Sequence, residues 1–352
     1  MAQRRKTRQV NAGGVLIGSD APVSVQSMLN IPSTDFEGSI RQAKALEEAG
    51  CQIIRAAVPD MNAVRLFYEL KNSLTVPVVA DIHFDYRLAL ESVAAGVDKI
   101  RINPGNIGSA DRVKAVAVAC MQKNVPIRIG VNSGSVEKEL LAKFGGPSPK
   151  ALVESALNHA KLLEKYDFYD TVISIKSSDV ETMIKAYELC AEKCDYPLHL
   201  GVTEAGTQRM ALVKSSIGIG SLLAKGIGDT IRVSMTADPV KEVAAGFDIL
   251  KALGLKKDCV QIVSCPTCGR TRVDLIALAD EVEKRLKNCK KPITVAVMGC
   301  AVNGPGEARQ ADIGIAGGDG CVLIFKKGKI LRKAPENSAV DELIKEIETL
   351  EI

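Results

Sequence analysis

Three cysteines stand in two turns that follow runs of β-branched residues. Cys265 and Cys268 belong to the sequence Cys-Pro-Thr-Cys-Gly, and Cys300 lies in Met-Gly-Cys-Ala-Val-Asn-Gly-Pro-Gly-Glu. Three thiolates in two turns can hold zinc, an iron–sulfur cluster or a redox disulfide. A thioredoxin-like CxxC precedes a helix in a different fold and needs no third cysteine, so the pattern favours a metal site.

The fourth ligand of this metal site stays open. Structural zinc normally has a second closely spaced ligand pair, and here only Cys300 accompanies the CxxC pair. The fourth ligand can be Cys289, Cys321 or a residue other than cysteine, and Glu307 lies in the same Gly/Pro-rich loop as Cys300. Three cysteines and one weaker ligand would leave one iron exchangeable, as a substrate-binding site needs. The pattern therefore favours an iron–sulfur cluster over zinc.

Cations and other polar residues recur near the ends of the β-branched runs that precede Ala237. Side chains alternate along a strand, so residues two or four apart share a face. Polar residues on one face of these runs are Arg55, Asp81 and His83, Arg101 and Asn103, Arg128 and Asn132, Ser174 and Lys176, His199 and Thr203, and Arg232 and Ser234.

Five of these residues are cations, and each comes from a different run. If the runs form a barrel, the five side chains meet at one end and repel one another unless an anion binds between them. The five are Arg55, Arg101, Arg128, Lys176 and Arg232. Guanidinium forks bind phosphate oxygens bidentately, so the set predicts a polyanionic small ligand, although a single arginine is more often a rim salt bridge. Glu204 and Asp81 are the acids nearby, and either can move protons or orient a hydroxyl. The alternatives are an ion pair of Asp81 with an arginine and a purely hydrogen-bonding role for His83.

The elements that position these residues follow one repeated pattern of a short β-branched run, a helical stretch and a turn. Thr34 and Glu37 indicate a capping box, and Asp238-Pro239 opens a later helix. Eight such units over about 230 residues predict a (β/α)₈ TIM barrel, with a doubly wound open sheet as the rival. The runs are residues 23–28, 52–58, 77–84, 98–104, 125–132, 171–177, 197–204 and 229–235.

The pattern changes after residues 256–258. Four further strand-like runs and two helical stretches predict a smaller α+β domain. We therefore expect a TIM barrel that binds a polyanionic ligand over residues 1–255 and an α+β iron–sulfur domain over residues 256–352. The runs of the second domain are residues 260–264, 293–299, 311–317 and 321–327, and its helices are residues 272–287 and 338–351.

Composition limits the other function classes. The chain has 352 residues, a net charge of +4, no tryptophan and 4% aromatic residues, which argues against a nucleic-acid partner. No apolar run approaches the roughly 18 residues of a membrane span, and the basic N-terminus lacks the apolar segment of a secretory signal. We therefore expect a cytoplasmic protein without a membrane partner, whose ten cysteines are mostly thiols or metal ligands.

The ordered motifs resemble one family along the chain from about Arg5 to the C-terminus. In sequence they are VQSM, ADIHF, RINPGNIG, RIGVNSGS, SIKSSD, TEAG, KSSIGIG, GDTIRVS, CPTCGR and VMGC followed by VNGPGEA. They closely resemble the bacterial, two-domain form of 4-hydroxy-3-methylbut-2-en-1-yl diphosphate synthase. The stretch after Glu204-Ala-Gly varies from the family's pattern, which leaves the contacts of that loop open.

The resemblance implies a reaction. Members of the family reductively open 2-C-methyl-D-erythritol 2,4-cyclodiphosphate to 4-hydroxy-3-methylbut-2-enyl diphosphate and water, in the non-mevalonate route to isoprenoids. Electrons come from flavodoxin or ferredoxin. The implied ligands of a [4Fe-4S] cluster are Cys265, Cys268, Cys300 and Glu307, and the implied diphosphate site is Arg55, Arg101, Arg128 and Lys176, with His83, Asn132, Glu204 and Ser234 in matching motifs.

Chain topology adds an expectation about assembly. Barrel strands run toward the mouth, so the last barrel helix, about residues 239–253, returns the chain to the opposite end. In a head-to-tail homodimer, each cluster serves its partner's barrel and the chain need not fold back along its own barrel, and the resemblance implies the same arrangement.

Two other functions compete with the one that the resemblance implies. One is a non-redox, phosphate-handling barrel of the pterin-condensing synthase type with a zinc domain, and the other is a regulatory or RNA-binding cluster protein.

Overall fold

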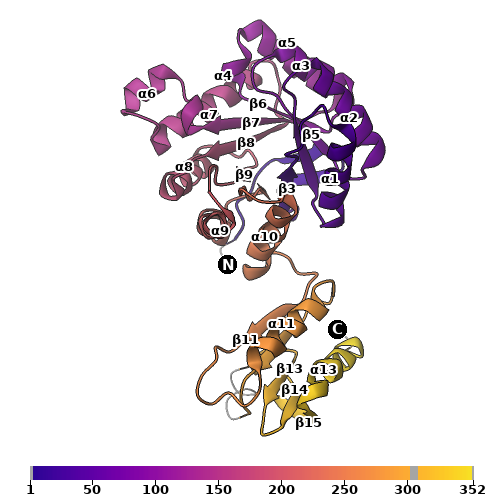
Figure 1. Ribbon diagram of the computed structural model, residues 1–352. Helices are drawn as coiled ribbons and strands as arrows, with labels where there is room; N and C mark the ends of the chain where they lie inside the picture. Colours follow the sequence, from indigo (N-terminus) through magenta and orange to yellow (C-terminus); the bar gives the residue numbers. More distant parts are fainter. Residues whose placement is uncertain (1–2, 302–307, 351–352) are drawn as a thin grey trace. The chain divides into compact units, whose positions relative to one another are not determined.

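The computed structural model describes residues 3–301 and 308–350, in two compact units that divide after Leu255. The first unit is a barrel of eight parallel strands (Figure 1). The strand order is β8-β7-β6-β5-β4-β3-β10-β9, and a bridge between Ile173 and Leu198 joins the two ends of that row. The predicted TIM barrel is therefore confirmed. Its strands are β3 (Ser24–Met28), β4 (Ile53–Ala57), β5 (Val78–Asp81), β6 (Lys99–Ile102), β7 (Ile127–Asn132), β8 (Thr171–Lys176), β9 (His199–Leu200) and β10 (Thr230–Ile231).

Helices surround the barrel and begin at polar caps. Asp238 caps the last of them with Pro239 at its first position, as the sequence predicts. The predicted capping box of Thr34 and Glu37 is wrong, because the Asp35 carboxylate accepts the Gly38 N–H and is itself the cap. The main helices are α1 (Phe36–Glu48), α2 (Met61–Ser73), α3 (Tyr86–Ala94), α5 (Ala110–Lys123), α7 (Pro149–Glu164), α8 (Val180–Lys193), α9 (Gln208–Ala224) and α10 (Pro239–Ala252), with short helices α4 (Pro104–Ile107), η1 (Ser133–Ser135) and α6 (Lys138–Phe144) in the loops after β6 and β7.

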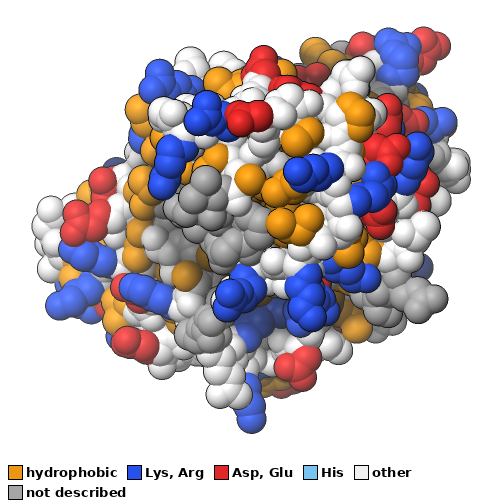
Figure 2. All heavy atoms as spheres, turned by 90° about the horizontal axis from the view of Figure 1, so that it is seen from below, with side chains coloured by type: hydrophobic (Ala, Val, Ile, Leu, Met, Phe, Trp, Pro, Cys, Tyr) orange, Lys and Arg blue, Asp and Glu red, His pale blue; other side chains and the backbone are white. Residues whose placement is uncertain are grey.

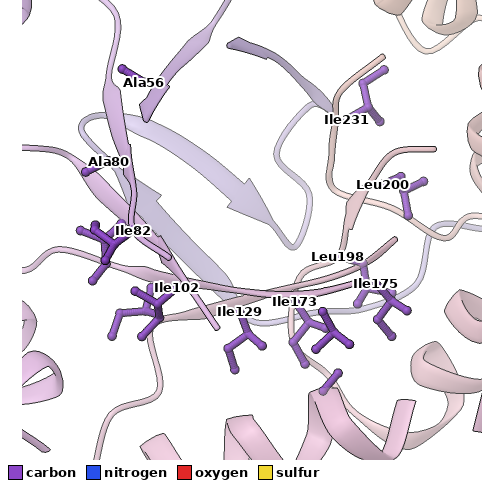
Figure 3. Close-up of a cluster of buried hydrophobic side chains, with 14 of the residues drawn as sticks. Ala56, Ala80, Ile82, Ile102, Ile129, Ile173, Ile175, Leu198, Leu200 and Ile231 are labelled. Atoms are coloured by element: carbon purple, nitrogen blue, oxygen red, sulfur yellow. The ribbon is translucent and has the colours of Figure 1, made fainter. Parts of the chain in front are cut away.

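The apolar core of the first unit lies between the strands and the helices. Ile129, Ile173 and Ile231 stand on the outer face of the strand ring, where Figure 3 shows them among other fully buried side chains. Since successive residues of a strand point to opposite faces, the residues between them point into the barrel. The polar residues of the sequence pattern are those inward-pointing residues.

An N-terminal hairpin closes the end of the barrel where the strands begin. Its strands are β1 (Gln9–Ala12) and β2 (Val15–Gly18). Val10 and Ile17 pack against three inward-pointing residues of the barrel, Ile53, Val79 and Val172, in a separate apolar cluster. Arg55 follows Ile53 on the same face of β4. The barrel interior therefore changes along its axis from an apolar plug to a charged mouth.

The second unit is a five-stranded mixed sheet with the order β11-β12-β13-β14-β15. The first three strands are parallel, and the last two pair antiparallel. This confirms the predicted α+β fold, but β15 is an unpredicted strand whose side chains are mostly exposed. The elements are β11 (Gln261–Ser264), α11 (Leu275–Leu286), β12 (Thr294–Met298), β13 (Ile313–Gly317), β14 (Cys321–Lys326), β15 (Lys329–Pro335), η2 (Glu336–Ser338) and α13 (Ala339–Glu348).

No helix in the part of the chain that the structure describes is long and apolar enough to span a membrane. Basic and acidic side chains both occur across the face seen in Figure 2.

Candidate active site

Asp81 is the centre of the charged mouth. It ends β5 in the barrel interior, and its Oδ1 lies 3.1 Å from Nη1 of Arg101. Its Oδ2 lies 3.6 Å from Nε of Arg55 and 4.0 Å from Nε2 of the half-exposed His83. Burial alone would raise the pKa of this carboxyl, but Arg55 and Arg101 outweigh burial and hold the pKa at about 2. Asp81 is therefore an ion-pair partner at neutral pH rather than a proton donor.

Arg128, which pairs with Arg101 across β6 and β7, is 1% exposed. Its Nη1 donates to Oγ of Ser174 at 2.6 Å, while its Nε and Nη2 have no hydrogen-bond partner within the described residues. Next to it, Nη2 of Arg101 donates to the carbonyl of Gly130 at 3.2 Å. A side chain at Gly130 would overlap the Arg101 guanidinium, so glycine makes room for that group. Donors of Arg128 are thus left for a ligand or for water.

Lys176 shows that the five predicted cations form one cluster. Its pKa is held well below the ordinary lysine value, first by burial and then by Arg55, Arg232, Arg128 and Arg101. Each of the four arginines must therefore lie close enough to repel its ammonium group. The five cations that the sequence places on inward faces of separate strands therefore lie close together in the structure.

Glu242 is a member of the mouth that the sequence analysis missed. It lies on α10, is buried, and its Oε2 is 3.2 Å from Nη2 of Arg232. It also accepts hydrogen bonds from Oγ of Ser27 at 3.0 Å and from the N–H of Met235 at 3.1 Å. A glutamate in the first turn of a helix carries little signal in the sequence, because helices commonly present such acids to solvent.

Asn103 and Asn132 fix the loops that follow β6 and β7. Oδ1 of Asn103 accepts the N–H of Gly105 at 3.1 Å and begins α4, and its buried Nδ2 has no partner among the described residues. The N–H of Asn132 donates to Oγ of Ser135 at 3.0 Å, and its Oδ1 is likewise buried without a partner in that part of the chain. Each amide therefore keeps one group for a further hydrogen bond.

Glu204 lies in the loop after β9 with a backbone φ of +51°. This left-handed conformation is costly for a residue other than glycine and clusters at functional sites. Its side chain is exposed, whereas Ser234, in the loop after β10, is half-buried. The N–H of Thr236 donates to the carbonyl of Gly206 at 3.0 Å and ties the two loops together. Glu204 is therefore an exposed carboxylate on a fixed loop at the mouth.

Cys265 and Cys300 lie at the same end of two neighbouring parallel strands. Cys265 directly follows β11, and Cys300 follows β12 by two residues. The N–H of Gly299 donates to Sγ of Cys265 at 3.2 Å, so the two turns touch at the sulfur. Cys268 is exposed, and hydrogen bonds from Arg270 lower the pKa of its thiol, which favours the thiolate that binds metals.

The two cysteine alternatives for the fourth ligand differ in position. Cys289 follows α11, which leads from the end of β11 back to the start of β12, so it lies at the opposite edge of the sheet. Cys321 begins the antiparallel strand β14 and lies at the same edge as Cys265. Glu307 falls outside the described residues. Among those residues, no three His, Cys, Asp or Glu side chains are close enough to hold a metal ion. The sheet therefore brings the strand ends that carry Cys265 and Cys300 together, but the described thiols do not converge on one point.

Comparisons with known proteins cover both units. Residues 7–247 match the GcpE TIM-barrel domain, and residues 261–349 match the GcpE protein C-terminal domain. The chain belongs to the GcpE family. A relative from Clostridium perfringens is 60% identical over 347 residues, 99% of each chain, and one from Clostridium acetobutylicum is 59% identical over 99% of this chain and 100% of its own. Both bear the name 4-hydroxy-3-methylbut-2-en-1-yl diphosphate synthase (flavodoxin).

Two solved structures of other proteins are similar in fold to about 70% of this chain. Dihydropteroate synthase from Stenotrophomonas maltophilia has a TM-score of 0.52 and 16% identity, over 70% of this chain and 97% of its own. The Yersinia pestis enzyme has a TM-score of 0.51 and 13% identity, over 71% of this chain and 100% of its own. Likeness at this identity concerns the fold alone, so it gives no support to a pterin-condensing activity.

Proposed function

We propose that the chain opens 2-C-methyl-D-erythritol 2,4-cyclodiphosphate reductively to 4-hydroxy-3-methylbut-2-enyl diphosphate, a step of the non-mevalonate route to isoprenoids. Full-length relatives that bear this synthase's name support the proposal. The structural observation that carries it is the cluster of five buried or half-buried cations in one barrel mouth with two ion-paired carboxylates, Asp81 and Glu242, within the described residues. Such an excess of positive charge suits a compact dianion.

The barrel residues divide into those that bind and those that position. Arg55, Arg101, Arg128 and Lys176 bind the diphosphate oxygens, and the unpartnered donors of Arg128 suit the innermost oxygen. Asp81 keeps Arg55 and Arg101 in place through its two oxygens. The remaining lining residues that we assign to substrate binding are Asn103, Asn132, Arg232 and Ser234.

The proton that the reaction consumes comes from an exposed residue of the mouth. The reaction converts a cyclic dianion, two electrons and one proton into a trianionic diphosphate and water. We assign the proton to Glu204, because it is an acid on a fixed loop with no ion-pair partner at 4.0 Å or less among the described residues. His83, 4.0 Å from Asp81, hydrogen-bonds the substrate beside it.

The second unit fits the [4Fe-4S] cluster that we propose as cofactor. Cys265, Cys268 and Cys300 would hold it with Glu307 as the weaker ligand, and the Gly299 N–H at Cys265 is the kind of hydrogen bond that tunes cluster sulfur. When bound, the cluster supplies electrons to the substrate one at a time. Flavodoxin or ferredoxin is the proposed donor to it.

We propose a head-to-tail homodimer in which each cluster serves the partner's barrel. The strands run toward the mouth, so α10 ends at the opposite end of the barrel, and Gly254 with a φ of +62° is a candidate hinge just beyond it. On α9, Met210, Val213 and Ile217 are about half exposed at 52%, 46% and 51%. These residues share one helical face, and an exposed apolar stripe on the barrel suits contact with a second copy.

Subunit exchange tests the shared site. Mixing an Arg55→Met protein with a Cys300→Ser protein gives heterodimers in which one mouth and one cluster are intact. If sites are shared between chains, those two intact halves meet and activity returns. If each chain uses its own cluster, every site stays defective and the mixture remains inactive.

Metal analysis tests the cofactor. We expect anaerobically purified protein to contain about four iron and four acid-labile sulfide per chain, as a [4Fe-4S] cluster requires. Stoichiometric zinc without sulfide would overturn the cofactor assignment and favour a non-redox barrel enzyme.

A further inference from the structure

A second layer of polar side chains lies beneath the cations of the mouth. Lys99 precedes Arg101 by two residues on β6, so it points into the barrel one layer deeper. The side chain is 0% exposed, and its Nζ has no hydrogen-bond partner within the described residues. A barrel interior is usually filled by valine, isoleucine and leucine, so a buried lysine here calls for a physical reason.

The charged groups that act on the Lys99 ammonium are cationic. Burial, Arg128 and then Arg55 disfavour its charged form and lower its pKa to about 7. His199 is fully buried too, with both ring nitrogens unpartnered in the described chain, and its pKa is held well below the ordinary value, first by burial and then by Arg128 and Lys176. The titratable or charged groups that the neighbouring strands direct inward are Arg55 on β4, Asp81 on β5, Arg128 on β7, Lys176 on β8, His199 on β9 and, just after β10, Arg232.

No carboxylate compensates Lys99. Asp81 is shared between Arg55 and Arg101, and no Asp or Glu oxygen within the described residues lies 4.0 Å or less from Nζ of Lys99. An ammonium group that is fully buried without a counter-ion is expensive, so the empty barrel favours the amine. An anion on the arginines above would reverse that preference, because it supplies the missing negative charge.

We propose that Lys99 adjusts the charge of the barrel to its ligand, as an amine in the empty barrel and an ammonium when the cyclic diphosphate lies on Arg55 and Arg128. The inference rests on the proposed function and deepens it by adding a positioning residue that does not touch the substrate. The proton comes from solvent as substrate binds. The ammonium form of Lys99 also stabilises the product of ring opening. That step leaves the electron pair of the broken C–O bond on a phosphate oxygen and raises the ligand's charge from −2 to −3.

Proton uptake on binding can be assigned to the protein, because the ligand itself does not change protonation in the working pH range. Each phosphorus of a cyclic diphosphate carries one strongly acidic oxygen, so the ligand remains a dianion between pH 6 and 9. Any proton that is taken up on binding therefore belongs to the protein. Because binding raises the pKa of Lys99, affinity should fall as pH rises above 7. Lys176 can add to the uptake, so the decisive quantity is the difference between proteins with and without Lys99.

Calorimetric titration of the holoenzyme with the cyclic diphosphate tests the proposal, without reductant, at pH 8 and in buffers of different ionisation enthalpy. We expect the Lys99→Met and Lys99→Gln proteins to take up close to one proton fewer than the wild type. Between pH 7 and 9, the affinity of the wild type should fall with each pH unit, and that fall should be about one tenfold step smaller per unit in the two Lys99 variants. Lys44→Met, at an exposed lysine of α1, is the matched control and should behave as the wild type.

Equal proton uptake in the wild type and both Lys99 variants would overturn the proposal. Failure of the wild type to bind the cyclic diphosphate would instead overturn the proposed function. Wild-type protein with ¹³C at the lysine ε-carbons gives a readout that needs no variant to fold. The ε-carbon signal of one buried lysine beyond Lys176 should move from its amine to its ammonium position when ligand is added, and a spectrum without that movement would also contradict the role of Lys99.

Discussion

The barrel mouth and the cysteine edge of the second unit are assembled in different ways. In the mouth, Asp81 and Glu242 fix three arginines through buried ion pairs, and the resulting excess of positive charge needs only an anion to complete it. At the cysteine edge, the sheet places Cys265 and Cys300 on adjacent strand ends, but the described residues include no group of three close ligands. The mouth is thus preorganised by protein contacts, whereas a metal site of this kind gains its order from what it binds.

We expect the largest effect from a substitution that disrupts the cysteine edge and leaves the barrel mouth intact. Cys300→Ser removes a thiolate from the proposed cluster, so we expect iron and sulfide to be lost or gravely reduced and turnover to disappear. Cys190→Ser is the control, because Cys190 is buried in α8 of the barrel unit. Equal loss of sulfide from both proteins would contradict the ligand assignment.

We expect the next largest effect from substitutions that disrupt the barrel mouth and leave the cysteine edge intact. Arg55→Met or Arg128→Met removes a charge-assisted pair from a desolvated site, so affinity for the cyclic diphosphate should fall by about 2 kcal/mol or more, roughly thirtyfold. The cluster's visible spectrum should not change. Arg41→Met, at an exposed arginine of α1, should bind as the wild type. Unchanged affinity in both mouth variants would show that the cations are not the phosphate site.

A smaller effect sharpens the statement that Asp81 preorganises the mouth. Its folded pKa of about 2 lies below its ordinary value of 3.8, so ionised Asp81 stabilises the fold above pH 4 and loses that contribution as pH falls toward 2. Asp81→Asn should therefore lower the free energy of unfolding by roughly 2 kcal/mol at pH 7. Denaturant titrations at pH 7 and pH 3 measure the difference, which should shrink at the lower pH. A difference that grows on acidification would contradict the ion-pair role.

Much of the barrel and its cations could be predicted from the sequence, because both depend on short-range periodicity. A period of two placed Arg55, Asp81, Arg101, Arg128 and Lys176 on inward faces, and the same rule would have found Lys99 two residues before Arg101. Lys99 begins β6 instead of ending it, so a pattern of polar residues at strand ends does not include it.

The features that the sequence did not reveal depend on long-range contacts. The N-terminal hairpin is a plug because Val10 and Ile17 meet Ile53, a partner distant in the chain. Glu242 acts in the mouth through Arg232, although nothing near it in sequence distinguishes it from a surface acid. The exposed side chains of β15 hide its pairing with β14, since a strand with little burial shows no alternation.

Anaerobic turnover of 2-C-methyl-D-erythritol 2,4-cyclodiphosphate with a chemical one-electron reductant tests the central claim most directly. We predict that cluster-loaded protein forms 4-hydroxy-3-methylbut-2-enyl diphosphate with two electrons consumed per product, and that the cluster-free Cys300→Ser protein forms none. Cluster-loaded protein that leaves the cyclic diphosphate unchanged, or cluster-free protein that converts it equally well, would contradict the claim.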